Sequence, residues 1–313
     1  MSEEPKEYAT RDGFGEGIVE AARADERVVV LTADLKDSLK LTAFAKEFPT
    51  RFIECGVAEQ NMMGIAAGLA HSGKIPFVCS YAVFSPGRNW DQLRVSVCYS
   101  QANVKIIGGH TGLSVGADGA THQGLEDIAI TRVLPNLTVV VPADSGESKK
   151  ATLAIAQYSG PCYVRLTREK SPSIVTTESI FTIGKANVLR QGSDVTIIGC
   201  GPLLAEVLKA ARVLEKEGIH AEVVNNHTIK PLDSETILTS VKKTKRVVTI
   251  EDHQIMGGMG SSVCELLSQE YPVPVHRMGM QDSFGESGTP QELYTKYGLT
   301  SEAIAQRVKD ILV

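Results

Sequence analysis

The stretch RFIECGVAEQNMMGIAAGLAHSGKIPFVC, residues 51–79, holds a strand-like run, a helix-like run and a second strand-like run in direct succession. The outer runs, RFIECG and KIPFVC, are short and largely apolar, as strands buried in a sheet are. The middle run is rich in Ala, Leu, Glu and Gln, which is typical of a helix. Strand, helix and strand in this order predict two parallel strands joined by a helix that covers the sheet.

The same alternation extends in both directions along the chain. Further apolar runs rich in β-branched residues precede and follow the stretch, and SGESKKATLAIAQYSG is a helix-like run between the last two. These runs are VVVL (28–31), VKII (104–107), LTVVVP (137–142) and CYVRL (162–166). We therefore expect a parallel sheet of about six strands, covered by helices on both faces, with active residues at the carboxyl ends of the strands.

A weakly patterned stretch at about 169–193 separates this series from a second one. The second series contains the strand-like runs VTIIGC, AEVVN and RVVTIED, with helices predicted from Pro202 to about Gly218 and near 234–241. The chain is therefore predicted to be α/β throughout, with a smaller, mixed sheet in its second half. The predicted division is a larger domain over 1–170, a linker over 171–190 and a smaller C-terminal domain over 191–313.

Composition narrows the classes of partner. With 313 residues, of which 42% are hydrophobic and 22% charged, the chain is long enough for two globular cores. A net charge of −5 with scattered Lys and Arg argues against nucleic acid and anionic membranes and favours small metabolites. Six cysteines without metal-binding spacing predict buried free thiols in a reducing compartment. The polar N-terminus and the lack of a long apolar run predict a cytoplasmic protein without a secretory signal or a membrane helix.

Polar and aromatic residues follow several of the predicted strands. Glu59 follows RFIECG and opens a helix, where a carboxylate by itself would simply complement the positive helix N-terminus. Tyr81 and Phe84 follow the next strand, and their spacing alone is also typical of core packing. His110 and His122 lie in a loop that has five glycines between residues 108 and 119 and also contains Asp118. Two histidines in such a strand-end loop predict a polar site that could bind sugar oxygens.

Three residues fit a phosphate site. Arg11 precedes a helix in ATRDG, Ser38 lies in ADLKDS, and Arg168 follows the fifth apolar run in RLTRE. A guanidinium matches the oxygens of a phosphate in a bidentate way, although a lone arginine is more often a solvated charge.

Several other motifs are predicted to be structural. GFGEG (13–17), GCGP (199–202) and MGGMG (256–260) indicate tight turns and close helix packing, because none has the spacing of a dinucleotide fingerprint. The triplet EDH (251–253) ends a strand, where adjacent side chains point in different directions, so it is not predicted to act as one metal or acid–base cluster.

Three segments together resemble the pyrimidine-binding part of thiamine-diphosphate enzymes. They are GVAEQNM (56–62), YAVF (81–84) and GGHTGLSVGADGATHQ (108–123). Over nearly its whole length the chain resembles the C-terminal subunit of a split transketolase. The resemblance implies a pyrimidine-binding domain followed by a smaller transketolase C-terminal domain, which in this family mainly supports assembly.

The resemblance also implies residue roles at the cofactor. Glu59 would hydrogen-bond the N1′ nitrogen of the aminopyrimidine and favour the imino tautomer that removes the thiazolium C2 proton. Tyr81 and Phe84 would stack on the pyrimidine ring. Asp34 and Leu35 would form the edge of the thiazolium pocket.

Further roles concern the substrate. By resemblance, His110 would contact the sugar or its phosphate, Asp118 a hydroxyl next to the reacting carbon, and His122 an oxygen on that carbon. The distal phosphate of the sugar would be held by Arg11, Ser38 and Arg168.

The sequence departs from the family pattern at two places. A third aromatic residue is often found near positions 87 and 88, where this chain has Gly87 and Arg88; Trp90 is a candidate to replace it. Transketolases usually have an acidic residue before Asp118, where this chain has Ala117, and in this respect the loop resembles deoxyxylulose-phosphate synthase.

A diphosphate-binding motif, a strand-end GDG followed by an asparagine, does not occur in the 313 residues. The resemblance therefore implies that an N-terminal transketolase subunit holds most of the thiamine diphosphate and the Mg²⁺, in a heterotetramer of two large and two small chains. The implied activity is transfer of a two-carbon ketol unit from a ketose phosphate to an aldose phosphate, as in the pentose phosphate pathway. The alternatives are half of a deoxyxylulose-phosphate-synthase-like enzyme and a non-catalytic partner subunit.

Overall fold

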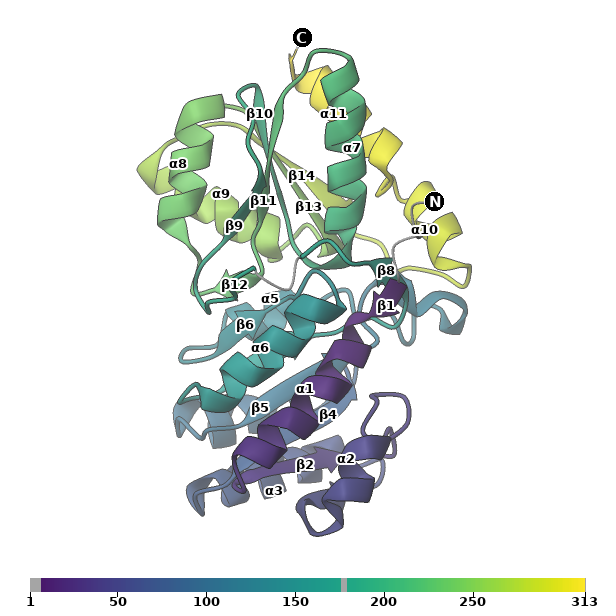
Figure 1. Cartoon of the computed structure of the whole chain (residues 1–313), viewed down its shortest axis with the longest axis vertical. Coiled ribbons are helices and arrows are strands. Elements are labelled where there is room, and N and C mark those ends of the chain that lie inside the picture. The colour runs from purple at the N-terminus through teal and green to yellow at the C-terminus, as the bar shows by residue number, and fades with distance from the viewer. Residues whose placement is uncertain (1–6, 176–178, 313) are drawn as a thin grey trace.

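The computed structural model describes residues 7–175 and 179–312. The N-terminal residues 1–6, part of the predicted linker (176–178) and residue 313 lie outside the described residues. The chain forms a larger and a smaller α/β domain stacked along the long axis of the molecule (Figure 1). The predicted fold class is thereby confirmed.

The larger domain is built on a seven-stranded sheet with the order β12-β6-β7-β5-β4-β2-β3. Six of the strands are parallel, and β12 is added at one edge, antiparallel to β6. All the predicted runs form strands, and most of them are apolar enough to be buried on both faces, whereas the edge strand β3 is only partly buried. The strands are β2 (Val28–Thr32), β3 (Phe52–Glu54), β4 (Ile75–Tyr81), β5 (Lys105–Gly109), β6 (Thr138–Val140), β7 (Cys162–Arg165) and β12 (Thr228–Lys230).

Helices cover both faces of this sheet, as predicted. One face packs against α1, α2 and α6, and the other against α3, η2 and α5. The first group is α1 (Thr10–Ala24), α2 (Thr42–Glu47) and α6 (Ser145–Gln157), and the second is α3 (Glu59–His71), η2 (Leu93–Tyr99) and α5 (Asp127–Arg132). The short turns are η1 (Pro49–Arg51), α4 (Trp90–Gln92) and η3 (Leu113–Asp118), and a small antiparallel pair is formed by β1 (Glu7–Ala9) and β8 (Lys170–Pro172).

The smaller domain has a five-stranded mixed sheet with the order β14-β13-β10-β11-β9, in which β9 is antiparallel. Its strands are β9 (Asn187–Arg190), β10 (Val195–Gly199), β11 (Ala221–Asn225), β13 (Val247–Gln254) and β14 (Val275–Met280). Its helical elements are η4 (Gly201–Leu203), α7 (Leu204–Lys216), α8 (Ser234–Thr244), α9 (Met259–Glu270), α10 (Pro290–Lys296) and α11 (Ser301–Leu312). Because β9 falls inside the predicted linker, the second sheet begins before residue 191; the exact division into domains stays a prediction.

The two domains share a hydrophobic core. Val139 and Val141 of the larger domain belong to the same buried cluster as Ile198 and Val224 of the smaller one. The strand β12 follows β11 in the chain but pairs with β6 across the junction. The junction is therefore a packed part of the structure, and the two domains position each other.

The GFGEG segment lies inside α1, where it allows this helix to pack closely on α6. A Cβ atom at Gly13 would lie 1.8 Å from the carbonyl oxygen of Ser145, and one at Gly17 would lie 2.9 Å from Cβ of Thr152. The predicted close helix packing is confirmed, but the segment is helical rather than a turn.

All six cysteines are free, as predicted. Four are buried, whereas Cys55 and Cys264 are half-buried, so the prediction of burial was wrong for these two. Among the described helices, none is both long and apolar enough to cross a membrane.

Candidate active site

The predicted site residues follow the carboxyl ends of neighbouring parallel strands. Glu59 comes after β3, Tyr81 ends β4, His110 follows β5, and Arg168 follows β7. Arg11 opens α1, next to these loops. A parallel sheet brings such ends to one edge, and the contacts below show which of the side chains meet there.

Glu59 lies at the first position of α3 and is only 1% exposed. Its Oε2 accepts a hydrogen bond from Nη1 of Arg88 at 2.7 Å, and its backbone carbonyl accepts one from Nδ2 of Asn89 at 3.1 Å. The Arg88 guanidinium also lies over the ring of Phe84, 4.7 Å from its centre. The carboxylate is thus buried and paired with an arginine. A carboxylate that only complemented the positive end of a helix would need neither the burial nor the partner.

Arg88 is a site residue that the sequence analysis did not assign. It occupies the position where the family often has a third aromatic residue. Here the planar guanidinium of Arg88, instead of a third ring, lies over Phe84. Trp90 does not complete the aromatic group as predicted, because its indole Nε1 donates to the carbonyl of Ile130 at 2.7 Å and the ring packs on the core.

Four rings from two strand-end loops form one cluster. Tyr81 stacks on His110 with 3.9 Å between ring centres, and Phe84 lies 6.2 Å from Tyr81. His122 meets Phe84 edge-on at 5.7 Å. The loops after β4 and β5 therefore place both predicted histidines beside both predicted aromatic residues.

His110 is buried and held in a left-handed backbone conformation, with φ of 51°. Its Nε2 lies 3.4 Å from Nη1 of Arg11, and since a guanidinium can only donate, Nε2 accepts and Nδ1 carries the proton. Burial, helped by the charges of Arg11, Arg168 and His122, lowers the pKa of His110 to about 3, so the ring is neutral near neutral pH. Within the described residues, the buried Nδ1 has no hydrogen-bond partner, which leaves a donor available to a ligand.

Two arginines lie near His110. Nη1 of Arg11 donates to the backbone carbonyl of Ser38 at 2.9 Å, which joins two of the three predicted phosphate-site residues. Arg168 donates to Oδ2 of Asp118 at 3.1 Å and to the carbonyl of Val115 at 2.9 Å. Arg11 and Arg168 therefore both contact the loop that contains Asp118, and Ser38 is joined to this loop through Arg11.

Asp34 and Leu35 lie in the loop after β2. Oε1 of Glu54 accepts hydrogen bonds from the backbone of Asp34 at 2.8 Å and of Gly56 at 3.0 Å, which ties this loop to the turn before Glu59. Leu35 packs against the core of the larger domain. In the part of the chain that the structure describes, no hydrogen bond or ring contact joins Asp34 or Leu35 to the ring cluster. Glu54 is a second residue that the sequence analysis missed.

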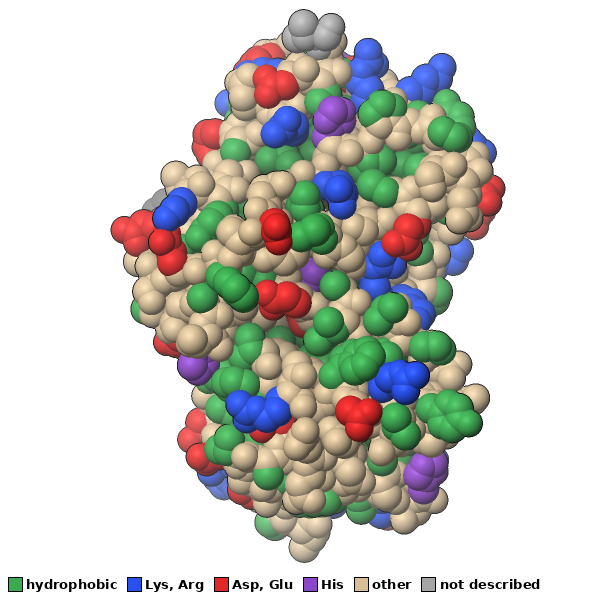
Figure 2. Space-filling view, turned by 180° about the vertical axis from the view of Figure 1, so that it is seen from behind, with side chains coloured by type: hydrophobic (Ala, Val, Ile, Leu, Met, Phe, Trp, Pro, Cys, Tyr) green, Lys and Arg blue, Asp and Glu red, His purple; other side chains and the backbone are tan. Residues whose placement is uncertain are grey.

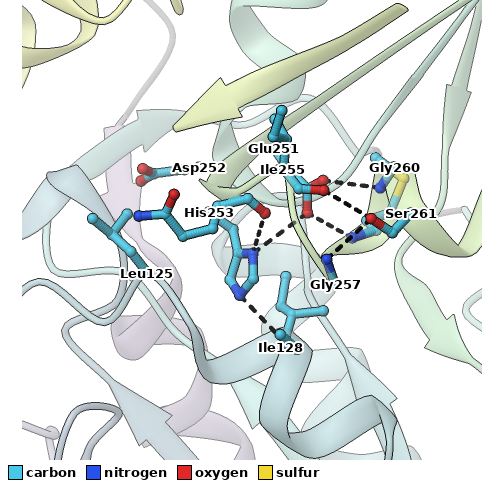
Figure 3. Close-up of polar contacts among 12 residues, drawn as sticks. Leu125, Ile128, Glu251, Asp252, His253, Ile255, Gly257, Gly260 and Ser261 are labelled. Atoms are coloured by element: carbon cyan, nitrogen blue, oxygen red, sulfur yellow. Dashed lines mark hydrogen bonds and ion pairs between the residues drawn. The ribbon is translucent and has the colours of Figure 1, made fainter. Parts of the chain in front are cut away.

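The triplet 251–253 alternates across the sheet as predicted (Figure 3). Glu251 accepts hydrogen bonds from Met259 and Gly260 at the start of α9, and Nδ1 of His253 lies 3.8 Å from Oε2 of Glu251. Asp252 points to the other side, toward the loop that carries His110.

Comparisons with known proteins give the family. Residues 6–173 match the family model of the transketolase pyrimidine-binding domain, and residues 184–304 match that of the transketolase C-terminal domain. This chain belongs to the transketolase family.

Two curated transketolase subunits and one solved structure are similar to almost the whole chain. The 6-deoxy-6-sulfo-D-fructose transketolase subunit SqwH of Clostridium sp. is 42% identical, with 98% of this chain and 95% of that protein covered. An apulose-4-phosphate transketolase subunit of Phocaeicola vulgatus is 42% identical, with 95% and 96% covered. A split-gene transketolase solved as an inactive β4 tetramer is 46% identical, with 97% and 98% covered and a TM-score of 0.91.

Transketolases depend on thiamine diphosphate, and the residues at the strand ends fit its aminopyrimidine ring. Tyr81 and Phe84 offer ring faces for a planar heterocycle, and Glu59 offers a buried carboxylate beside them. Two buried nitrogen atoms, Nδ1 of His110 and Nε of Arg11, are left without a partner in the described chain. Unpaired buried donors are costly, so a polar ligand is expected at this place.

Proposed function

We propose that this chain is the pyrimidine-binding, C-terminal subunit of a two-chain transketolase that transfers a two-carbon ketol unit from a ketose phosphate to an aldose phosphate. The observation that carries the proposal is the buried Glu59 carboxylate beside a cluster of two aromatic rings and two histidines. A non-catalytic partner subunit has no need to keep a carboxylate, rings and arginines together at one sheet edge.

In this proposal each side chain has a definite task. Thiamine diphosphate, when bound, supplies the carbanion chemistry. Glu59 bonds the N1′ nitrogen of the pyrimidine, and Arg88 holds the carboxylate in place through Oε2. Tyr81 and Phe84 hold the ring by stacking.

The substrate is held by the polar residues around the same loop. Neutral His110 donates from Nδ1 to a sugar or phosphate oxygen, and His122 binds an oxygen on the reacting carbon. Asp118 binds a neighbouring hydroxyl. Arg11, Arg168 and the Ser38 segment bind the distal phosphate, because guanidinium groups match its oxygens. Asp34 and Leu35 line the thiazolium side.

The diphosphate and its Mg²⁺ are assigned to an N-terminal partner subunit, since the chain has no diphosphate motif of its own. Large hydrophobic side chains are exposed on α3 and η2, including Ile65 at 38%, Val95 at 45% and Tyr99 at 84%. Hydrophobic side chains also stand out on the face turned away from α1 and α6 (Figure 2). Exposed apolar surface of this kind supports an interface with another subunit, and we assign the chain to a heterotetramer of two large and two small chains. The free cysteines fit a cytoplasmic location.

A second candidate reaction is favoured by one residue. Ala117 stands before Asp118, as in deoxyxylulose-phosphate synthase, which condenses pyruvate with glyceraldehyde phosphate. The curated relatives include enzymes of sulfofructose and of apulose phosphate, so the sugar substrates differ within the family.

Reconstitution tests the proposal. The purified chain is mixed with its N-terminal subunit, thiamine diphosphate and Mg²⁺, and two-carbon transfer from xylulose 5-phosphate to ribose 5-phosphate is assayed. Transfer by the mixture and by neither subunit alone is the expected result. A stable, cofactor-loaded complex that consumes pyruvate and transfers no ketol unit would support the synthase reaction instead, and the absence of any complex would contradict both.

A further inference from the structure

The loop that carries His110, Asp118 and His122 contains one short, irregular turn, η3, and several residues with positive φ. His110, Gly112, Gly116 and Gly119 all have φ between 51° and 76°. Gly116 also interrupts the short turn η3 with non-helical angles. Glycines in such conformations give the unbound loop many alternatives, so contacts from outside must select one of them.

The larger domain holds the two ends of the loop and contacts its middle through Arg168, which bonds Val115 and Asp118. Near one end, the backbone nitrogen and Oγ1 of Thr111 both donate to the carbonyl of Leu166, at 3.2 and 3.0 Å. Gly112 donates to the carbonyl of Gly124 at 2.8 Å, which closes the loop at its base. The middle of the loop projects away from this sheet toward the smaller domain.

The smaller domain holds the middle of the loop. The Leu113 side chain is fully buried in the core of that domain, in one cluster with Val248 and Ile250 of β13. The Leu113 backbone nitrogen donates to Oδ1 of Asp252 at 2.9 Å. A Cβ atom at Gly112 would lie 2.0 Å from Oδ2 of Asp252, so the backbone and the carboxylate are in close contact.

Asp252 is itself fixed from two sides. Tyr294 of α10 donates to its Oδ2 at 3.1 Å. Its backbone carbonyl accepts a hydrogen bond at 2.7 Å from Arg165, whose guanidinium is paired with Asp127 at 2.9 Å. All of these side chains apart from Tyr294 are less than 10% exposed. Burial raises the pKa of the Asp252 carboxyl, although the charge of Arg165 opposes this rise.

We propose that Asp252 is a positioning residue, which through Leu113 sets the conformation of the loop and so the places of His110, Asp118 and His122. The smaller domain then has a task beyond assembly, because it shapes the sugar-binding side of a site formed at the edge of the other sheet. The effect on catalysis rests on the proposed function, whereas the effect on the loop does not.

The test compares three substitutions in the full chain. Asp252→Ala removes the acceptor for Leu113. Asp252→Asn keeps an oxygen at that place and serves as the conservative variant. Asp233→Ala is the matched control, since Asp233 is a buried carboxylate of the smaller domain that caps α8 and bonds Ala186, away from the loop.

In the reconstituted complex, Asp252→Ala is expected to lower kcat/KM for both sugar phosphates about 10- to 100-fold, as loss of one buried hydrogen bond allows. The cofactor affinity of Asp252→Ala is expected to stay unchanged. Asp252→Asn is expected to keep most of the wild-type activity, and Asp233→Ala is expected to lower only the Tm. Hydrogen exchange in residues 110–123 of the chain is expected to speed up in Asp252→Ala alone.

Equal kinetics and equal loop exchange for Asp252→Ala and Asp233→Ala would overturn the inference. If Asp252→Ala does not fold, Tyr294→Phe removes the bond to Oδ2 and is expected to give a smaller change in the same direction; no change at all would count against the inference. A wild-type complex without any ketol transfer would refute the proposed function, and the exchange measurement would still decide whether Asp252 holds the loop.

Discussion

Single residues at the sheet edge owe their properties to their immediate partners. The carboxylate of Glu59 is buried at the start of α3, and it is paired because the loop after β4 brings Arg88 to it. His110 is neutral because it is buried beside two arginines. These partners decide what each group can do chemically: Glu59 accepts, and His110 donates from Nδ1.

The pair Glu59–Arg88 is expected to couple the two residues energetically. Arg88→Met leaves a buried carboxylate with one partner fewer, but Arg88 is about half exposed, so water compensates in part. A double-mutant cycle with Glu59→Gln is expected to give a coupling of about 1 kcal/mol in the free energy of unfolding. Urea unfolding of the chain alone measures it, and strictly additive single substitutions would rule the coupling out.

For single residues, the sequence predicts which of them lie at the site better than it predicts their hydrogen-bond partners. Glu59, Tyr81 and His110 could be found because parallel strands present their carboxyl ends at one edge. Arg88 and Glu54 could not, since neither an arginine in a loop nor a single glutamate at the end of a strand gives a periodic signal. That the Ser38 carbonyl accepts from Arg11 depends on the path of the backbone, which composition does not reveal.

Whole elements are positioned by close helix packing and by strands that cross the junction. The helices α1 and α6 pack along the same face of the larger sheet, in front of it in Figure 1. Their contact depends on Gly13 and Gly17, at which a side chain would meet the backbone or a side chain of α6 or the residues that begin it. The start of α1 in turn places Arg11 beside His110.

Gly13→Ala is expected to destabilise the chain by about 1–3 kcal/mol, because the new methyl group has no room beside Ser145. Gly64→Ala is the matched control, since Gly64 also lies in a helix but has open space around its Cα. It is expected to stabilise the chain by about 0.5–1 kcal/mol through helix propensity. Thermal unfolding measures both, and equal effects of the two substitutions would contradict this view of the helix contact.

The apolar strands of both sheets were predictable from the sequence. The strand that joins the two domains, β12, was not. The residues of β12 have no alternating or continuous apolar pattern, so their pairing with β6 could not be foreseen. The same holds for the contact of Asp252 with Leu113, which depends on how the two sheets dock. Contacts between residues 139 positions apart depend on tertiary packing rather than local propensity.

The molecule as a whole buries titratable groups at the domain junction. His227 is fully buried next to β12 and packs against Phe181 with tilted rings, 4.4 Å between ring centres; burial lowers its pKa from 6.5 to about 4. Because the folded state holds this ring neutral, its contribution to stability is complete above the ordinary pKa and is lost as the pH falls toward 4.

His227→Asn is expected to make the chain less sensitive to acid. Between about pH 7.5 and about pH 5, the wild-type chain should lose about 2 kcal/mol more of its free energy of unfolding than the variant does. The control is His71→Asn, at the exposed end of α3, which should leave the wild-type slope unchanged. If the free energy of unfolding depended on pH in the same way for the wild type and for His227→Asn, His227 would not titrate as its burial requires.

The central claim is that this chain supplies the carboxylate that activates a cofactor held mainly by another subunit. The most direct test is two-carbon transfer by the reconstituted complex with Glu59→Gln, compared with wild type and with Glu222→Gln, which changes an equally buried carboxylate far from the site. Glu59→Gln is predicted to assemble normally and to lose activity about a thousandfold, whereas Glu222→Gln keeps it. Near-normal transfer by Glu59→Gln would contradict the account.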